Sequence, residues 1–425
     1  MAGKLLFGAL ADDLTGGVEL AGMLAAGGAA TQLVTDAAAV DEVRGADAIV
    51  IARRTRVIPA ADAVAAFREG GEALKAHGAR QIFYKYCATF DSTPAGNIGP
   101  CADVLREITG ADGTLFCPSF PEPERTVYQG HLFVGSALVS NSPKRLDPLT
   151  PMTEPDLVKV LQAQTATKVG LVALPTVLAG AEAVRAAARA LFAAGTAYAI
   201  VDTVSESDLV TIAEATWDWP LMTGGSSVAA YYPGLWQRHG LLQAKVPAPL
   251  PGMDGPGVVL AGSCAAQTQA QMAAFAEYHP VLGIDLTASE NVEASVARAL
   301  DWAERQASAA VGFTTAETAE SVAAAQSALG RDGAARRAEQ ILAALAKQLV
   351  ERGTRRLVVA GGETSGAVVE ALGIRRMTVA PFTRPGIGLC VTDAPEPLAL
   401  CLKSGKLGSR DMFAEALATM GRAHA

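Results

Sequence analysis

Leu5–Ala25 reads LLFGALADDLTGGVELAGMLA. An apolar run, Leu5–Ala11, is followed by two aspartates, a threonine and two glycines, and then by a helical pattern over Val18–Ala25. This order of strand, polar turn and helix is typical of an open α/β sheet, in which ligands bind beyond the carboxyl ends of the strands. The stretch therefore predicts both the fold class and a place for chemistry.

The same alternation continues along the first half of the chain. Alanine-rich segments with helical spacing separate the apolar runs, and one of them, Ala181–Ala194, predicts a helix that ends at Gly195. We expect strands at Leu5–Ala11, Ala48–Ala52, Ile82–Tyr86, Leu115–Cys117, Val169–Leu174 and Tyr198–Val201. This pattern predicts a mostly parallel sheet flanked by helices.

A change of composition at Lys245–Gly257 marks the expected domain boundary. The segment, KVPAPLPGMDGPG, has four prolines and three glycines among thirteen residues, which suits a linker better than a helix or a central strand. The alternation then resumes with strands at Val258–Ala261 and Leu357–Ala360 and helices at Gln267–Tyr278 and Ala334–Arg352. We predict two α/β domains, residues 1–245 and 257–425.

Composition excludes several classes of protein. The chain has 425 residues, 50% of them hydrophobic and 18% charged, so it can form cores and is not a disordered protein. Its net charge of −8, with no basic stripe, argues against a nucleic-acid partner. The longest uncharged stretches, Trp219–Gln237 and Gly255–Ala276, contain polar residues, glycine or proline throughout and do not predict a membrane span.

The six cysteines contain no C-x-x-C pair and lie mostly in apolar segments, which predicts reduced, buried thiols in a cytoplasmic protein. No secretion signal is visible, because Leu5–Ala11 is short and two aspartates follow it. The five histidines have no ligand spacing to the cysteines, so we expect no zinc site. Cys264 has no histidine near it in sequence and is interpreted as a buried thiol, not a nucleophile.

The first polar turn is the first candidate site. Asp12, Asp13 and Thr15 stand with two glycines at the carboxyl end of the first strand. The structural alternative is that Asp13 or Thr15 only caps the following helix. Because a cap needs one such residue and several are present, we favour a functional role.

A second polar loop follows the strand at Ile82–Tyr86. It supplies a cation, an anion, hydroxyls and an amide within thirteen residues: Lys85, Asp91, Ser92, Thr93 and Asn97. This mixture suits a small polyhydroxy acid, although a solvated turn has a similar composition. Arg53–Arg56 ends another strand, so its cations could reach the same edge or form an exposed basic cluster.

Three glycine-bearing turns occur in the second half: Gly262–Cys264, Gly361–Gly366 and Lys403–Gly408. Paired glycines let backbone N–H groups approach phosphate oxygens, and a following helix adds its positive end. Neither a P-loop nor a complete G-x-G-x-x-G is present, and one tight turn alone needs glycine for other reasons. Three such turns in one domain predict a nucleotide pocket.

Together these stretches resemble the four-carbon acid sugar kinases over nearly the whole chain. The resemblance rests on ALADDLTGGVELA, KYCATFDSTPAGNIGP, PERTVYQGHLF, TGGSS, AGSC, VVAGGETSGAV and LKSGKLG. Within the family, KYCATFDST, RTVYQG and DPLTPMTEPDL most resemble the members that phosphorylate the 4-hydroxyl of 3-oxo-tetronates with ATP. Members that act on threonate or erythronate are the alternative.

The resemblance implies a substrate domain at 1–245, a nucleotide domain at 257–425 and a cleft between them. It implies ATP and Mg²⁺ as cofactors, and a small acid sugar as the partner, with a homo-oligomer possible. It places the following residues around ATP: Ser263, Gly361, Gly362, Glu363, Thr364 and Gly405. It places Asp12, Arg56, Lys85 and Asp91 near the acid sugar, and we add Thr15, Ser92 and Asn97 from their positions in the polar turns.

Within this reading, Asp12 or Asp13 orients or deprotonates the attacking hydroxyl, while the other positions metal or caps the helix. Lys85 and Arg56 hold the substrate carboxylate, and the glycine turns hold the ATP phosphates. Two rivals stay open. One is a nicotinamide-dependent hydroxy-acid dehydrogenase. The G-x-G-x-x-G motif expected after its first strand is missing, which argues against it. The other is a non-catalytic module that binds acid sugars.

Overall fold

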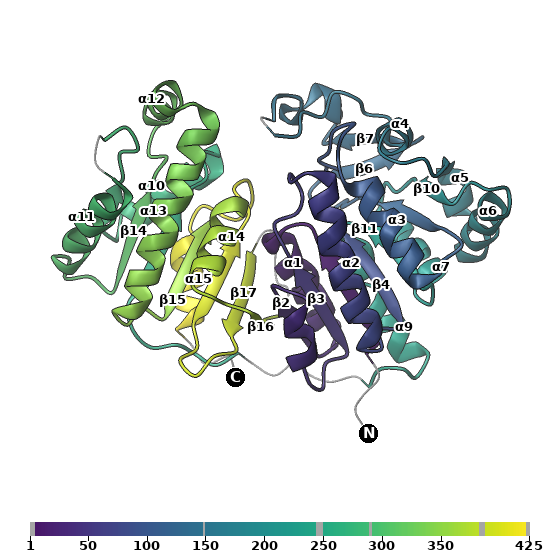
Figure 1. Cartoon of the computed structure of the whole chain (residues 1–425), viewed down its shortest axis with the longest axis horizontal. Helices are drawn as coiled ribbons and strands as arrows, with labels where there is room; N and C mark the ends of the chain where they lie inside the picture. The colour runs from purple at the N-terminus through teal and green to yellow at the C-terminus, as the bar shows by residue number, and fades with distance from the viewer. Residues whose placement is uncertain (1–4, 148, 244–249, 289–290, 382–386, 422–425) are drawn as a thin grey trace. The chain divides into compact units, whose positions relative to one another are not determined.

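The computed structural model describes residues 5–147, 149–243, 250–288, 291–381 and 387–421 (Figure 1). The chain forms two compact units, Met1–Pro247 and Ala248–Ala425. Part of the predicted boundary, residues 245–249, lies outside the described residues.

The first unit is built around a sheet of parallel strands in the order β2-β3-β1-β4-β11-β5-β10-β9. These strands are β1 (Phe7–Ala11), β2 (Thr31–Val34), β3 (Ala48–Ala52), β4 (Gln81–Lys85), β5 (Thr114–Cys117), β9 (Val169–Val172), β10 (Tyr198–Val201) and β11 (Leu221–Gly224). The helices are α1 (Leu14–Ala26), α2 (Ala60–Ala76), α3 (Ile98–Thr109), α4 (Leu157–Gln162), α5 (Leu174–Leu178), α6 (Ala181–Ala193), α7 (Glu206–Thr216), α8 (Ser226–Ala229) and α9 (Tyr232–Arg238).

A small antiparallel sheet of β6 (Arg125–Tyr128), β7 (His131–Val134) and β8 (Ala137–Leu138) is inserted after β5. The sequence analysis did not predict it, because its strands are short and only partly buried. The predicted strands of the parallel sheet and the helix before Gly195 are confirmed.

The order of the strands puts a change in the direction of the connections between β1 and β4. The chain leaves β1 through α1 toward β2, and it leaves β4 through α3 toward β5, which lies in the opposite direction along the sheet. Since such crossovers are right-handed, α1 and α3 cover opposite faces. The carboxyl ends of β1 and β4 therefore flank a topological switch point, where open α/β sheets bind their ligands.

The second unit has the strand order β13-β14-β12-β15-β18-β17-β16, in which the first five strands are parallel and β17 is antiparallel to both of its neighbours. The strands are β12 (Gly257–Ala261), β13 (Val281–Gly283), β14 (Ala310–Thr314), β15 (Arg356–Ala360), β16 (Arg376–Val379), β17 (Ile387–Thr392) and β18 (Ala399–Lys403). The helices are α10 (Ala266–Ala276), α11 (Val292–Glu304), α12 (Ala319–Leu329), α13 (Arg331–Glu351), α14 (Gly362–Ala371) and α15 (Met412–Met420).

This unit has a switch point of its own, between β12 and β15. The chain leaves β12 through α10 toward β13 at one edge, and it leaves β15 through α14 toward β16 at the other edge. The predicted turns after β12 and β15 are therefore neighbours at the end of the sheet where ligands bind.

Both units match the predicted α/β class, each with a mostly parallel sheet flanked by helices. The predicted apolar face of α13 is buried through Ile341, Leu342, Leu345 and Leu349. Among the described residues, no helix combines the length and the hydropathy that crossing a bilayer requires.

Candidate active site

Two carboxylates and an arginine meet at the carboxyl end of β1. Arg56 donates from Nε to Asp12 Oδ2 at 2.8 Å and from Nη2 to Asp12 Oδ1 at 2.7 Å. The same Nη2 lies 2.8 Å from Asp13 Oδ1. Arg56 is held beside β1 because its backbone N–H, like that of Thr55, donates to the carbonyl of Asp12. The planar guanidinium therefore binds both carboxylates at once.

Asp13 also caps α1, as the structural alternative predicted. Its Oδ1 accepts the backbone N–H of Gly16 at 3.1 Å, and its Oδ2 accepts the hydroxyl of Thr15 at 2.6 Å. Thr15 thus supports Asp13 directly. Both oxygens of Asp13 have protein donors, which fixes the side chain at the start of the helix.

Lys85 lies at the end of β4 and reaches over the start of α1. Its Nζ is 3.7 Å from Asp13 Oδ1, which is its one ion pair within the described part of the chain, and its side chain is 5% exposed. A Cβ at Gly16 would overlap Lys85 Nζ and Asp13 Oδ1. Gly16 therefore provides the space that this ammonium occupies.

The two aspartates have opposite pKa shifts. Burial raises the pKa of Asp12 above its usual value, against the opposing attraction of Arg56. Asp13 is also penalised by burial, but Arg56, Lys85, the Thr15 hydroxyl and the Gly16 N–H together hold its pKa well below the usual range. Asp13 is thus the more firmly ionised carboxylate.

The lowered pKa of Asp13 predicts how stability responds to acid. Its contribution to the free energy of unfolding is complete above the carboxyl pKa of the unfolded chain and is lost as pH falls toward the folded pKa. We expect Asp13→Asn to lower that free energy by about 1–3 kcal/mol at neutral pH, with a difference that shrinks below about pH 4. Denaturant titrations of both proteins across this range measure it. Asparagine also caps helices, so a difference independent of pH would contradict the charge-based explanation.

The remaining predicted residues of the first unit hold the loops around this cluster. Asn97 is buried and donates to the carbonyls of Thr55, Arg56 and Ile58 at 2.7, 3.3 and 3.3 Å. It therefore supports the segment that carries Arg56. Ser92 is also buried, and its hydroxyl accepts from Gln164 Nε2 at 2.8 Å.

Asp91 belongs to a second ionic cluster, which the sequence analysis missed. Lys144 Nζ lies 2.8 Å from Asp91 Oδ1 and 2.7 Å from Asp147 Oδ2. The Thr89 hydroxyl donates to the same Asp91 oxygen at 2.7 Å. Lys144 comes from a 3₁₀ helix more than fifty residues away along the chain, and nothing in its local sequence marks it as a partner of Asp91.

In the second unit the three predicted glycine turns converge. A Cβ at Gly262 would overlap Thr364 Oγ1, and a Cβ at Gly361 would lie 2.9 Å from the same atom and 3.5 Å from the backbone nitrogen of Ser263. Gly361 has φ +127°, which a side chain would strain. Gly362 and Glu363 begin α14, so its N-terminus faces the convergence. These contacts bring Ser263, Gly361 and Thr364 together.

The third turn, after β18, touches the first. A Cβ at Gly405 would overlap Ser263 Oγ, and the backbone N–H of Gly361 donates to the carbonyl of Lys403 at 2.9 Å. Every predicted ATP-binding residue therefore belongs to one cluster of turns beyond β12, β15 and β18. Their contact with ATP stays a prediction.

The interpretation of Cys264 as a buried thiol is wrong. Its side chain is exposed, whereas Cys101, Cys117, Cys390 and Cys401 are buried and Cys87 is partly buried. Cys264 lies in the turn after β12, beyond the buried strand, and the turn projects it outward. All six cysteines are free thiols.

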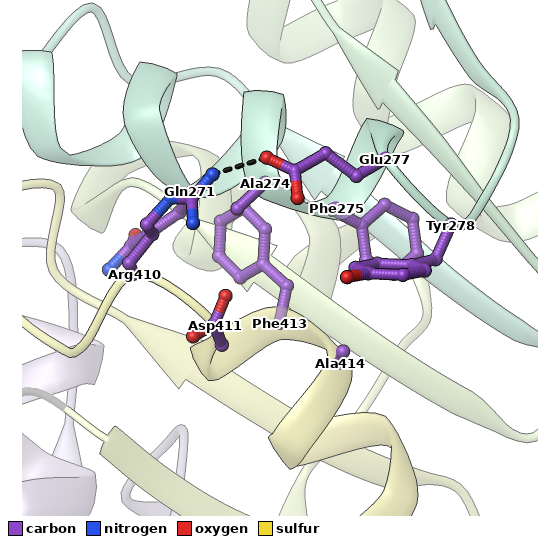
Figure 2. A pocket seen from close by; sticks show the side chains of 9 residues that line it. All are labelled: Gln271, Ala274, Phe275, Glu277, Tyr278, Arg410, Asp411, Phe413 and Ala414. Atoms are coloured by element: carbon purple, nitrogen blue, oxygen red, sulfur yellow. Dashed lines mark hydrogen bonds and ion pairs between the residues drawn. The ribbon is translucent and has the colours of Figure 1, made fainter.

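A surface pocket lies near the third turn, between the second half of α10 and the start of α15 (Figure 2). Phe275, Tyr278 and Phe413 contribute aromatic walls, and Arg410 forms an ion pair with Glu277 across it. None of the predicted ATP-binding residues lines this pocket, so it is separate from the cluster of turns.

Comparison with known proteins agrees with this arrangement. A model of a sugar-binding N-terminal domain matches residues 7–232, and a model of a nucleotide-binding C-terminal domain matches residues 258–413. Relatives named 3-oxo-tetronate kinase from Cupriavidus necator and Burkholderia multivorans are both 45% identical, covering 99% and 98% of this chain and 98% and 97% of their own.

Solved structures extend the match to three dimensions. A crystal structure from Salmonella typhimurium, provisionally described as a tRNA synthase, is 35% identical with a TM-score of 0.86, covering 97% of this chain and 98% of its own. One from Haemophilus influenzae is 32% identical with a TM-score of 0.76, covering 97% and 100%. With domain matches in both halves and relatives similar along its whole length, the chain belongs to the four-carbon acid sugar kinase family.

Proposed function

We propose that this protein is an ATP-dependent kinase that phosphorylates the 4-hydroxyl of 3-oxo-tetronate. The observation that carries the proposal is its 43–45% identity, over nearly the full length, to several relatives named 3-oxo-tetronate kinase. A charged cluster at one switch point and glycine turns at the other support it, because phosphoryl transfer needs a site for the hydroxyl and a site for the phosphates.

Asp12 is our choice for the residue that orients the 4-hydroxyl and accepts its proton. A carboxylate with a lowered pKa is a weak proton acceptor, and Asp13 has such a pKa because four groups stabilise its charge. Burial shifts the pKa of Asp12 in the opposite direction. Each Asp12 oxygen accepts one bond from Arg56, which leaves it a second lone-pair direction for the substrate.

Arg56 and Lys85 are proposed to bind the substrate carboxylate. Guanidinium has five N–H donors, and the contacts of Arg56 to the aspartates use Nε and Nη2. Within the described residues no hydrogen bond or ion pair uses Nη1, so its two donors can meet a ligand. Lys85 is buried and lies beyond hydrogen-bond distance from its partner Asp13, which also favours an incoming anion.

The turns around Ser263, Gly361–Thr364 and Gly405 are proposed to bind the ATP phosphates through backbone N–H groups and hydroxyls. Mg²⁺ usually takes one or two carboxylates together with substrate phosphates, and Glu363 offers a carboxylate in the first turn of α14. When bound, Mg²⁺ supplies positive charge that offsets the charge on the transferring oxygens. Transfer requires the two units to face each other across a cleft. We also propose that the enzyme is cytoplasmic and that it can form a homo-oligomer.

A coupled ADP-release assay tests the function. With Mg-ATP, we expect turnover of freshly generated 3-oxo-tetronate and much slower turnover of threonate and erythronate. Faster turnover of either of these acids would reassign the substrate. A thermal shift with NAD⁺ and none with Mg-ATP would favour the dehydrogenase. Acid-sugar binding without ADP release would favour a non-catalytic module.

A further inference from the structure

The turn after β18 is held by side chains from α10. Gln267 Nε2 donates to the carbonyl of Gly408 at 2.7 Å, and the Thr268 hydroxyl donates to the carbonyl of Gly405 at 2.8 Å. Gln271 Nε2 donates to the carbonyls of Leu407 and Ser409 at 3.1 and 2.8 Å. We call these three side chains, Gln267, Thr268 and Gln271, the α10 clamp.

Lys403 completes the arrangement from the end of β18. Its Nζ donates to Thr268 Oγ1 at 3.0 Å and to the carbonyl of Gly405 at 3.1 Å. The Lys403 side chain is fully buried, and burial lowers its pKa to about 8. Burying an ammonium is costly, and an apolar side chain would fill the same space without that cost. The two hydrogen bonds of Lys403 offset part of that cost, and they fix the positions of Thr268 and Gly405.

The clamp binds carbonyl groups and leaves the N–H groups of the turn available. Its hydrogen bonds go to the carbonyls of Gly405, Leu407, Gly408 and Ser409, and none of them uses a backbone N–H of the turn. Gly405 also lies directly against Ser263, since a Cβ there would overlap Ser263 Oγ. The turn thus lies beside the other glycine turns with N–H groups that the clamp does not occupy.

We propose that the α10 clamp and Lys403 are positioning residues for phosphate binding: they hold carbonyls of the turn, those of Gly405 and Leu407–Ser409, toward α10 and so keep the N–H groups directed to ATP. This inference rests on the proposed nucleotide site. A displacement of about 1 Å in such a turn is enough to weaken binding or transfer severely.

Thr268→Val tests the clamp, because valine keeps the shape of threonine and removes the hydroxyl that joins Lys403 to Gly405. We expect the KM for ATP to rise about tenfold, since the two hydrogen bonds of the hydroxyl are lost and the Gly405 carbonyl keeps only Lys403. The KM for the acid sugar should stay near the wild-type value. Thr268→Ser, which retains the hydroxyl, should restore the KM for ATP.

A second pair of variants distinguishes loss of the clamp from a folding defect in Thr268→Val. Gln267→Leu removes a clamp contact, whereas Gln269→Leu, on the same helix, removes a contact to the carbonyl of Ala316 instead. We expect only Gln267→Leu to raise the KM for ATP. Normal wild-type turnover with unchanged KM values for ATP in Thr268→Val and Gln267→Leu would overturn the clamp. Absence of ADP release by the wild type would instead refute the proposed function.

Discussion

Asp12→Asn is expected to lower kcat by about 10²–10⁴-fold, the usual contribution of a general base. Asparagine has nearly the same shape and can still accept one bond from Arg56, but it cannot take the proton of the 4-hydroxyl. Steady-state ADP release with saturating ATP and 3-oxo-tetronate measures the loss. The KM for ATP should change little, because the glycine turns belong to the other unit.

Asp13→Asn is the matched control for this prediction. Its position is adjacent, it also contacts Arg56, and asparagine retains the helix cap, so we expect a much smaller fall in kcat. Removing one charge of a buried ion pair also lowers stability, so thermal unfolding of both variants must accompany the kinetics. Folded Asp12→Asn with kcat near the wild-type value would show that Asp12 is not the base.

The location of both candidate sites could be predicted from sequence because their signals are local. Asp12 follows β1, and the Gly361 turn follows β15, so each polar turn is marked by the apolar run before it. The order of the strands in each sheet could not be predicted from such local signals. It depends on pairing between distant segments, and it is this order that puts β1 beside β4 and β12 beside β15.

Side-chain partners were the least predictable feature. The mixture after β4 indicated a polar ligand, yet Asn97 and Ser92 bond to the protein itself, and Asp91 pairs with Lys144. A single sequence gives the residue types but not the distant hydrogen-bond or ion-pair partner of each one. The sequence does contain a signal of the α10 clamp, since Gln267, Thr268 and Gln271 share one side of a helix otherwise rich in alanine.

Gly16→Ala is expected to reduce kcat/KM for the acid sugar by about 100-fold or more while the protein stays folded. The added Cβ would overlap Lys85 Nζ and Asp13 Oδ1, so both groups must leave the positions proposed for substrate binding. The lysine end is flexible and can move at low cost, and alanine favours a helix over glycine by about 1 kcal/mol. Function should therefore fall much further than stability.

Gly234→Ala is the control, because Gly234 lies within α9 of the same unit and a Cβ there meets no atom within 4 Å. It should leave kcat/KM unchanged and unfold at the same or a slightly higher temperature. In Gly16→Ala the KM for ATP should stay near the wild-type value, which separates a substrate defect from a general one. If Gly16→Ala instead retained full kcat/KM, the ammonium of Lys85 could not be needed where the structure places it, and the substrate carboxylate would have to bind elsewhere.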